Sequence, residues 1–89
     1  MLDNGSGRRN RHKVAFIKKH KNFAQTAFRD AIRLREKGED IRKSDVVTQL
    51  INMARIDLMY SPKTYSLDIF WSLMKVSHEL LENGENGNE

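Results

Sequence analysis

Residues 12–19, which read His-Lys-Val-Ala-Phe-Ile-Lys-Lys, carry most of the fold prediction. Val14, Phe16 and Ile17 lie close together in this stretch, and β-branched and aromatic side chains favour extended backbone. Lysines lie on both sides of the apolar group. The stretch therefore predicts a short β-strand with basic flanks.

Two amphipathic helices are expected to follow this strand. Asn22 can cap a helix over residues 23–37, and Gly38 can end it by taking the left-handed conformation. Ser44 can cap a second helix that ends before Pro62. In both segments apolar residues recur at helical spacing. They are Ala24, Ala27, Phe28, Ala31, Ile32 and Leu34 in the first, and Val46, Val47, Leu50, Ile51, Ala54 and Leu58 in the second.

A third helix is expected over residues 65–82, with Ser66 as its candidate cap. Its apolar face is wider than a normal amphipathic stripe. The face consists of Leu67, Ile69, Phe70, Trp71, Leu73, Met74, Val76, Leu80 and Leu81. Such a helix is buried on two sides or packs against another chain.

The 89 residues allow one domain with a modest core. The chain has no cysteine, so neither disulfides nor thiolate metal sites can stabilise it, and oligomerisation is the remaining common device. No apolar run reaches the roughly 18 residues that a bilayer span needs, and no secretory signal is recognisable. We therefore expect a cytoplasmic protein without a membrane partner.

Titratable residues give no indication of catalysis. His12, His20 and His78 are scattered, without cysteines or clustered carboxylates around them. No pairing of a nucleophile with a base is suggested. We therefore expect no enzymatic activity, no metal, no cofactor and no small-molecule substrate.

The charges are segregated along the chain. The net charge is +4, yet residues 1–37 hold 11 Lys/Arg against 3 Asp/Glu, and residues 38–89 hold 5 against 9. Residues 8–21 contain seven Lys/Arg and no acidic residue. Such a density attracts a polyanion through counterion release, although a solvated basic tail has the same composition.

A basic strand, a helix, a glycine turn and a second helix opening with Arg-Lys-Ser resemble the ribbon-helix-helix family. The resemblance covers residues 11–58 and is sharpest at residues 38–47, Gly-Glu-Asp-Ile-Arg-Lys-Ser-Asp-Val-Val. It implies a mainly α fold in which two copies pair their strands into a ribbon that rests on four helices. Because one strand and two helices cannot enclose a core, the resemblance also implies an obligate homodimer.

The outer face of such a ribbon enters the major groove of DNA. In the preferred register, four side chains face the bases: Arg11, Lys13, Ala15 and Ile17. In a register shifted by one residue, the outward-facing side chains are instead His12, Val14, Phe16 and Lys18. The first register is preferred because burying Phe16 gains more free energy than burying Ala15.

The start of the second helix is a candidate anion site. Ser44 and the free N–H groups after it can hold a phosphate, and Arg42 and Lys43 add charge beside it. The resemblance implies this phosphate clamp, although Ser44 would cap its helix in any case. The other expected phosphate contacts are Arg8, Arg9, Lys18 and Lys19. Arg8, Arg9 and Arg11 can instead form a flexible arm along the backbone or minor groove.

Four regions are expected: a disordered basic arm (1–10), the DNA-binding core (11–60), a helix that braces the dimer or contacts neighbouring dimers (61–82), and a disordered tail (83–89). The expected function is sequence-specific binding of double-stranded DNA, as a transcriptional repressor, a plasmid partition protein or a relaxosome accessory protein. The alternative is a small all-α interaction module or inhibitor whose basic segment docks on an acidic protein surface. RNA binding is less favoured because no aromatic stacking platform accompanies the basic segment.

Overall fold

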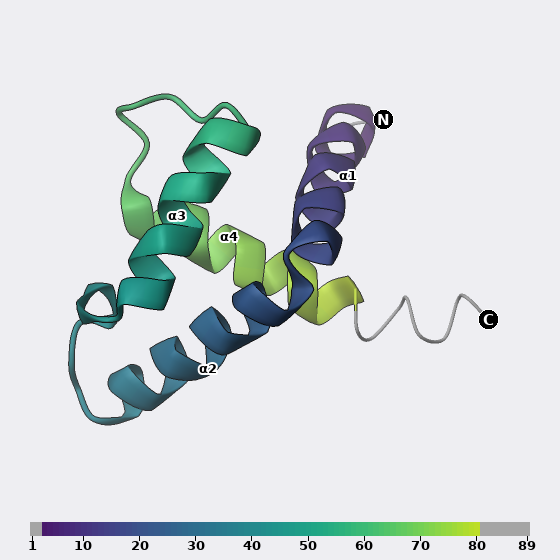
Figure 1. The fold of residues 1–89 in the computed structure, drawn as a ribbon. Helices are drawn as coiled ribbons and strands as arrows, with labels where there is room; N and C mark the ends of the chain where they lie inside the picture. The colour runs from purple at the N-terminus through teal and green to yellow at the C-terminus, as the bar shows by residue number, and fades with distance from the viewer. Residues whose placement is uncertain (1–2, 81–89) are drawn as a thin grey trace.

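The computed structural model describes the backbone of residues 3–80 and the side chains of residues 11–80. This part of the chain is helical, with no strand within it. Figure 1 shows the elements in order: α1 (Asp3–Lys19), α2 (Lys21–Glu36), the short 3₁₀ helix η1 (Ile41–Lys43), α3 (Asp45–Asp57) and α4 (Ser66–Glu79).

The strand predicted over residues 12–19 is wrong, because these residues belong to α1. Phe16 and Ile17 are adjacent, and both are buried in the core. Successive side chains of a strand point to opposite faces, so a strand with one face in solvent cannot bury both. Neighbouring positions on one face of a helix can. The need to bury this pair therefore overrides the extended preference of the individual side chains.

α2 begins and ends close to the predicted bounds. It starts at Lys21 after a break at His20, so the predicted cap Asn22 lies inside the helix. At its other end the prediction is confirmed, since Gly38 has a φ of 76°. The Gly38 and Glu39 N–H groups donate to the carbonyls of Arg35 and Leu34. These bonds satisfy the last carbonyls of the helix.

α3 starts as the sequence predicts. Ser44 is its N-cap, and the Ser44 Oγ accepts a 3.2 Å hydrogen bond from the Val47 N–H. Arg55, in the last turn of α3, holds the loop that leads to α4. Its guanidinium donates to the Thr64 carbonyl at 2.7 Å and to the Ser66 Oγ at 3.2 Å. Ser66 was expected to cap α4 and is instead its first residue.

α4 is the central helix of the fold. It contacts α1 and α3, and Figure 1 shows it passing behind α3 toward α1. Ile69, Phe70 and Leu73 are fully buried, and the Phe70 ring meets the edge of the Phe28 ring from α2. These contacts account for the broad apolar face of α4 within a single chain.

The ribbon-helix-helix fold is therefore wrong for this protein, although a mainly α fold is confirmed. The described residues contain no strand, so they cannot form the ribbon of that family. The argument for an obligate homodimer rested on a core that one copy cannot enclose. Here α1 and α4 complete the core within one chain, with sixteen buried apolar side chains among the described residues.

Candidate nucleic-acid interface

The outward side of α1 carries basic side chains. Arg11, Ala15, Lys18 and Lys19 follow the spacing that puts residues on one helix face, and all four are exposed. Phe16 and Ile17 point the opposite way, into the core. The same periodicity that buries the apolar pair therefore turns the basic residues to solvent.

Lys21 extends this surface past the break at His20, where α2 begins. We call Arg11, Lys18, Lys19 and Lys21 the basic face. Between the described side chains, the recorded ion pairs involve none of these four residues. The sequence itself contains no acidic residue between Asp3 and Asp30. Among the described side chains, no ion pair therefore compensates the charge of the basic face.

The four side chains predicted to face the bases do not share a surface. Arg11 and Ala15 are exposed, whereas Ile17 is 5% exposed and belongs to the core. Lys13 is half-buried, and its Nζ donates a 2.6 Å hydrogen bond to the Ser72 Oγ of α4. Both strand registers are therefore wrong. Arg8 and Arg9 lie in α1, but their side chains lie outside the described residues.

The predicted phosphate clamp at the start of α3 is already occupied by protein groups. Ser44 is 7% exposed, and its Oγ donates to the Asp30 Oδ2 at 3.0 Å while it accepts from Val47 N–H. Hydrogen bonds from Arg33 and Ser44 lower the pKa of Asp30, so this carboxylate stays ionised near neutral pH. Asp45 adds a second carboxylate in the first turn. Both negative charges oppose a phosphate at this helix end.

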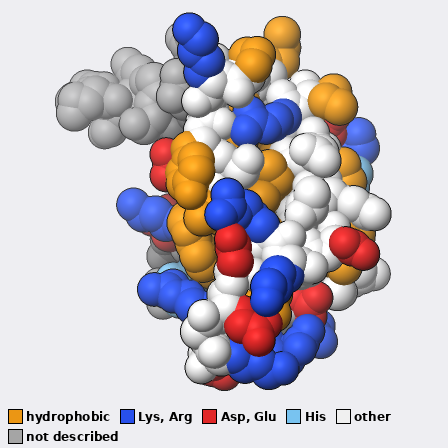
Figure 2. Space-filling view, turned by 90° about the vertical axis from the view of Figure 1, so that its left-hand side faces the viewer, with side chains coloured by type: hydrophobic (Ala, Val, Ile, Leu, Met, Phe, Trp, Pro, Cys, Tyr) orange, Lys and Arg blue, Asp and Glu red, His pale blue; other side chains and the backbone are white. Residues whose placement is uncertain are grey.

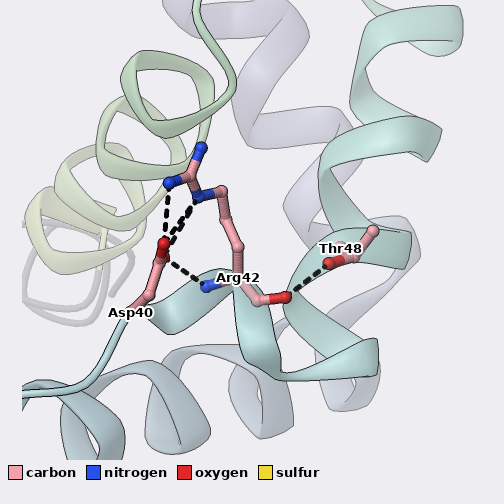
Figure 3. A network of polar contacts seen from close by, with 3 residues as sticks. All are labelled: Asp40, Arg42 and Thr48. Carbon is pink, nitrogen blue, oxygen red and sulfur yellow. Dashed lines mark hydrogen bonds and ion pairs between the residues drawn. The ribbon is translucent and has the colours of Figure 1, made fainter.

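Arg42 and Lys43 are paired with acidic neighbours. The Arg42 guanidinium donates to both carboxylate oxygens of Asp40, at 2.6 Å from Nη2 and 3.1 Å from Nε (Figure 3). Side-chain hydrogen bonds from Arg42, followed by the bond from its backbone N–H, lower the pKa of Asp40 to about 2. Lys43 Nζ lies 3.9 Å from the Glu39 Oε1.

We call Glu39, Asp40, Arg42 and Lys43 the η1 charge cluster. Figure 2 shows the side of the molecule on the left of Figure 1, where Lys/Arg and Asp/Glu side chains lie intermixed at the lower end. A phosphate would have to displace a carboxylate from Arg42 before it could take both donors. The cluster is therefore a poorer anion site than the sequence suggested.

Three comparisons with known proteins gave no match. The chain matches no family model, no curated protein and no solved structure. Functional inference therefore depends on the residues of this chain alone.

Other kinds of site have little support in the described part of the chain. It contains no group of three or more His, Asp or Glu side chains that can hold a metal ion. Among its helices, none is long and apolar enough to cross a membrane. His20 Nε2 lies 3.7 Å from Asp57 Oδ2, beyond hydrogen-bond distance, where the break between α1 and α2 meets the end of α3.

Lys21 is a residue that the prediction missed. In the N-terminal half of the chain, the expected phosphate contacts stopped at Lys19 because the strand was expected to end there. The acid-free stretch in the sequence, however, continues to Arg29, which is also exposed. Charge pattern alone, without any assumption about a strand, would have included both residues.

Proposed function

We propose that the protein is a small DNA-binding domain that holds the phosphates of a duplex along its basic face. The observation that carries this proposal is the exposure of Arg11, Lys18, Lys19 and Lys21 without acidic partners among the described residues. Each such charge can replace a condensed counterion on DNA, and the released ion drives binding. A charge that is already paired with a carboxylate contributes less binding free energy.

The shape of α1 supports the same partner. A helix with its side chains is about 10–12 Å wide, close to the width of the major groove. In Figure 1 the N-terminal part of α1 stands apart from the other helices. Ala15, between Arg11 and Lys18 on the outward face, is small enough to let the helix backbone approach the duplex.

Most of the affinity is expected to be independent of sequence. Phosphate contacts position a protein on DNA, whereas base contacts provide specificity. On the described part of the outward face, Arg11 has the side chain best suited to a guanine edge, and the lysines act as point charges. We therefore propose strong electrostatic binding with a modest base preference, rather than tight recognition of one operator.

An acidic protein surface is the second candidate partner. Apolar anchors of the kind that protein interfaces need are exposed elsewhere, at Ile56 (76%) and Met59 (86%) near the end of α3. The described part of the outward face of α1 offers only Ala15 as an apolar side chain. This composition favours a polyelectrolyte over a folded protein as the partner of the basic face.

Matched charge variants test the proposal. The variant Lys18→Ala/Lys19→Ala/Lys21→Ala and the control Lys37→Ala/Lys63→Ala/Lys75→Ala each remove three exposed lysines, so they have the same net charge. Fluorescence anisotropy with a 20-base-pair duplex (about two helical turns) over a salt series measures affinity. We expect the first variant to lower the salt slope by about 0.9 per lost contact, and the control to change it little. Equal effects, or no binding by the wild-type protein at low salt, would contradict the proposal.

A further inference from the structure

α4 packs against α1, and this contact fixes where α4 ends. The Arg35 guanidinium lies 5.2 Å from the centre of the Trp71 ring. Ile32, three residues earlier on α2, lines the same groove as Met74, three residues later on α4. The Phe28 and Phe70 rings are also in contact, so α2 and α4 cross rather than run side by side. Lys13 of α1 donates a hydrogen bond to Ser72 of α4, and Figure 1 shows α4 running from behind α3 toward the junction of α1 and α2.

The chain that continues from α4 is acidic. Residues 81–89 read Leu-Glu-Asn-Gly-Glu-Asn-Gly-Asn-Glu, with three glutamates and no Lys or Arg, and they lie outside the described residues. Nine residues reach at most about 30 Å when extended. The helix from Arg11 to Lys19 rises only about 12 Å. A segment tethered beside the start of α2 is therefore long enough to cover the basic face.

We propose that residues 81–89 dock on the basic face and compete with DNA for it, as a built-in inhibitor. Glu82, Glu85 and Glu89 supply negative charges to a surface that lies in the acid-free stretch between Asp3 and Asp30. This inference rests on the proposed function, because it concerns regulation of the same surface. It needs no second chain, since both partners belong to one protein.

The expected contact is weak and reversible. Exposed ion pairs contribute little individually, but a short tether holds the segment at an effective concentration in the millimolar range. The tail then lowers DNA affinity several-fold without abolishing it. Salt screens the contact, so the inhibition fades as ionic strength rises.

Two tail variants measure the inhibition. Glu82→Gln/Glu85→Gln/Glu89→Gln removes the three charges, and Asn83→Gln/Asn86→Gln/Asn88→Gln changes three residues of the same segment without changing charge. At low salt we expect the glutamate variant to bind a 20-base-pair duplex about three- to tenfold more tightly, and the asparagine variant to bind like wild type. Equal affinities of all three proteins would overturn the proposal.

Crosslinking separates a docked tail from a general effect of net charge. A carbodiimide joins a carboxylate to an amine only where the two are in contact, and mass spectrometry identifies the joined residues. In dilute protein we expect Glu82, Glu85 and Glu89 to couple to the basic-face lysines, and an excess of duplex to suppress the products. Lys37, Lys43, Lys63 and Lys75 are internal controls. Coupling spread evenly over all lysines, or tighter DNA binding of the glutamate variant without these products, would overturn docking.

The two proposals fail in different ways. Suppose that crosslinks form between the tail and the basic face, while neither the wild-type protein nor the glutamate variant binds a duplex. This result contradicts the DNA-binding function and keeps the intramolecular contact. Duplex binding that is unaffected by the tail, together with absent tail products, contradicts the inhibitor and keeps the DNA-binding function.

Discussion

Two pairs of adjacent basic residues look alike in the sequence and differ in the folded protein. Lys18 and Lys19 lie on the outward face of α1 with no acidic partner among the described residues, whereas Arg42 and Lys43 are paired with Asp40 and Glu39. The second pair also lies beside a helix N-terminus, which by itself attracts anions. Its carboxylates remove that advantage. Basic residues therefore indicate a polyanion site only where their acidic neighbours have been counted as well.

Charge reversal should break this comparison most strongly. Lys18→Glu/Lys19→Glu is expected to weaken duplex binding roughly tenfold or more and to lower the salt slope by about two units, because two phosphate contacts become repulsive. Arg42→Glu/Lys43→Glu has the same net charge and is expected to have a much smaller effect. Anisotropy titrations in identical buffer compare them. A larger loss from the Arg42/Lys43 pair would move the interface to η1.

Substitutions on the two sides of α1 should separate stability from binding. Ile17→Ala removes a side chain that is 5% exposed, so it should lower the free energy of unfolding by about 2 to 5 kcal/mol. Ala15→Lys, on the exposed face, should leave that free energy nearly unchanged and strengthen duplex binding by adding a charge. Urea unfolding and DNA titration measure both quantities. A strongly destabilised Ala15→Lys protein would mean that this face is packed against something.

The Asp40–Arg42 pair should give a stability that depends on acid. The hydrogen bonds from Arg42 lower the folded-state pKa of Asp40 to about 2, below the ordinary carboxyl value of 3.8. The contribution of the pair is therefore fully present above pH 4 and is lost as the pH falls toward 2. Asp40→Asn should flatten the dependence of the melting temperature on pH in this window and leave it unchanged above it. If the Asp40→Asn substitution changed the melting temperature only at higher pH, the loss of stability in acid would come from other groups.

Releasing Arg42 should have the smallest effect on DNA. Asp40→Asn frees the guanidinium, so duplex affinity at low salt should rise slightly, by less than adding a charge at Ala15. Asp68→Asn, an exposed acid in the first turn of α4, is the charge-matched control. If both substitutions raise affinity equally, the gain comes from net charge and η1 remains outside the interface. A gain at Asp40 that exceeds that of Ala15→Lys would make η1 part of it.

Three of the four helices could be predicted from the sequence because local signals agree with the tertiary packing. Gly38 and Ser44 mark the end of α2 and the start of α3, and the apolar stripes of these two helices are the faces that they bury. α1 could not be predicted in this way, since Val14, Phe16 and Ile17 favour a strand locally. Its helical signal is the spacing of Lys13, Phe16, Ile17 and His20, which lie on one helix face and are buried or half-buried, as is Val14 beside them.

The candidate site was predictable in its chemistry and less so in its geometry. The acid-free basic stretch by itself predicts a polyanion partner, and this prediction does not depend on a strand. The bond between Ser44 and Asp30 joins residues fourteen positions apart, so only the packing of α2 against α3 reveals it. The pairing of Arg42 with Asp40 is different, because an acid two residues away is visible in the sequence.

Backbone amide NMR spectra recorded during titration with a duplex test the central claim most directly, because each residue reports on its own surroundings. The basic face should show the largest shift changes, over residues 11–21, while residues 39–45 around η1 change little. The amide signals of residues 11–21 should return toward their positions in the free protein as salt is raised. Changes centred on residues 39–45, or no change at low salt, would contradict the claim that the uncompensated charges of α1 form the DNA-binding surface.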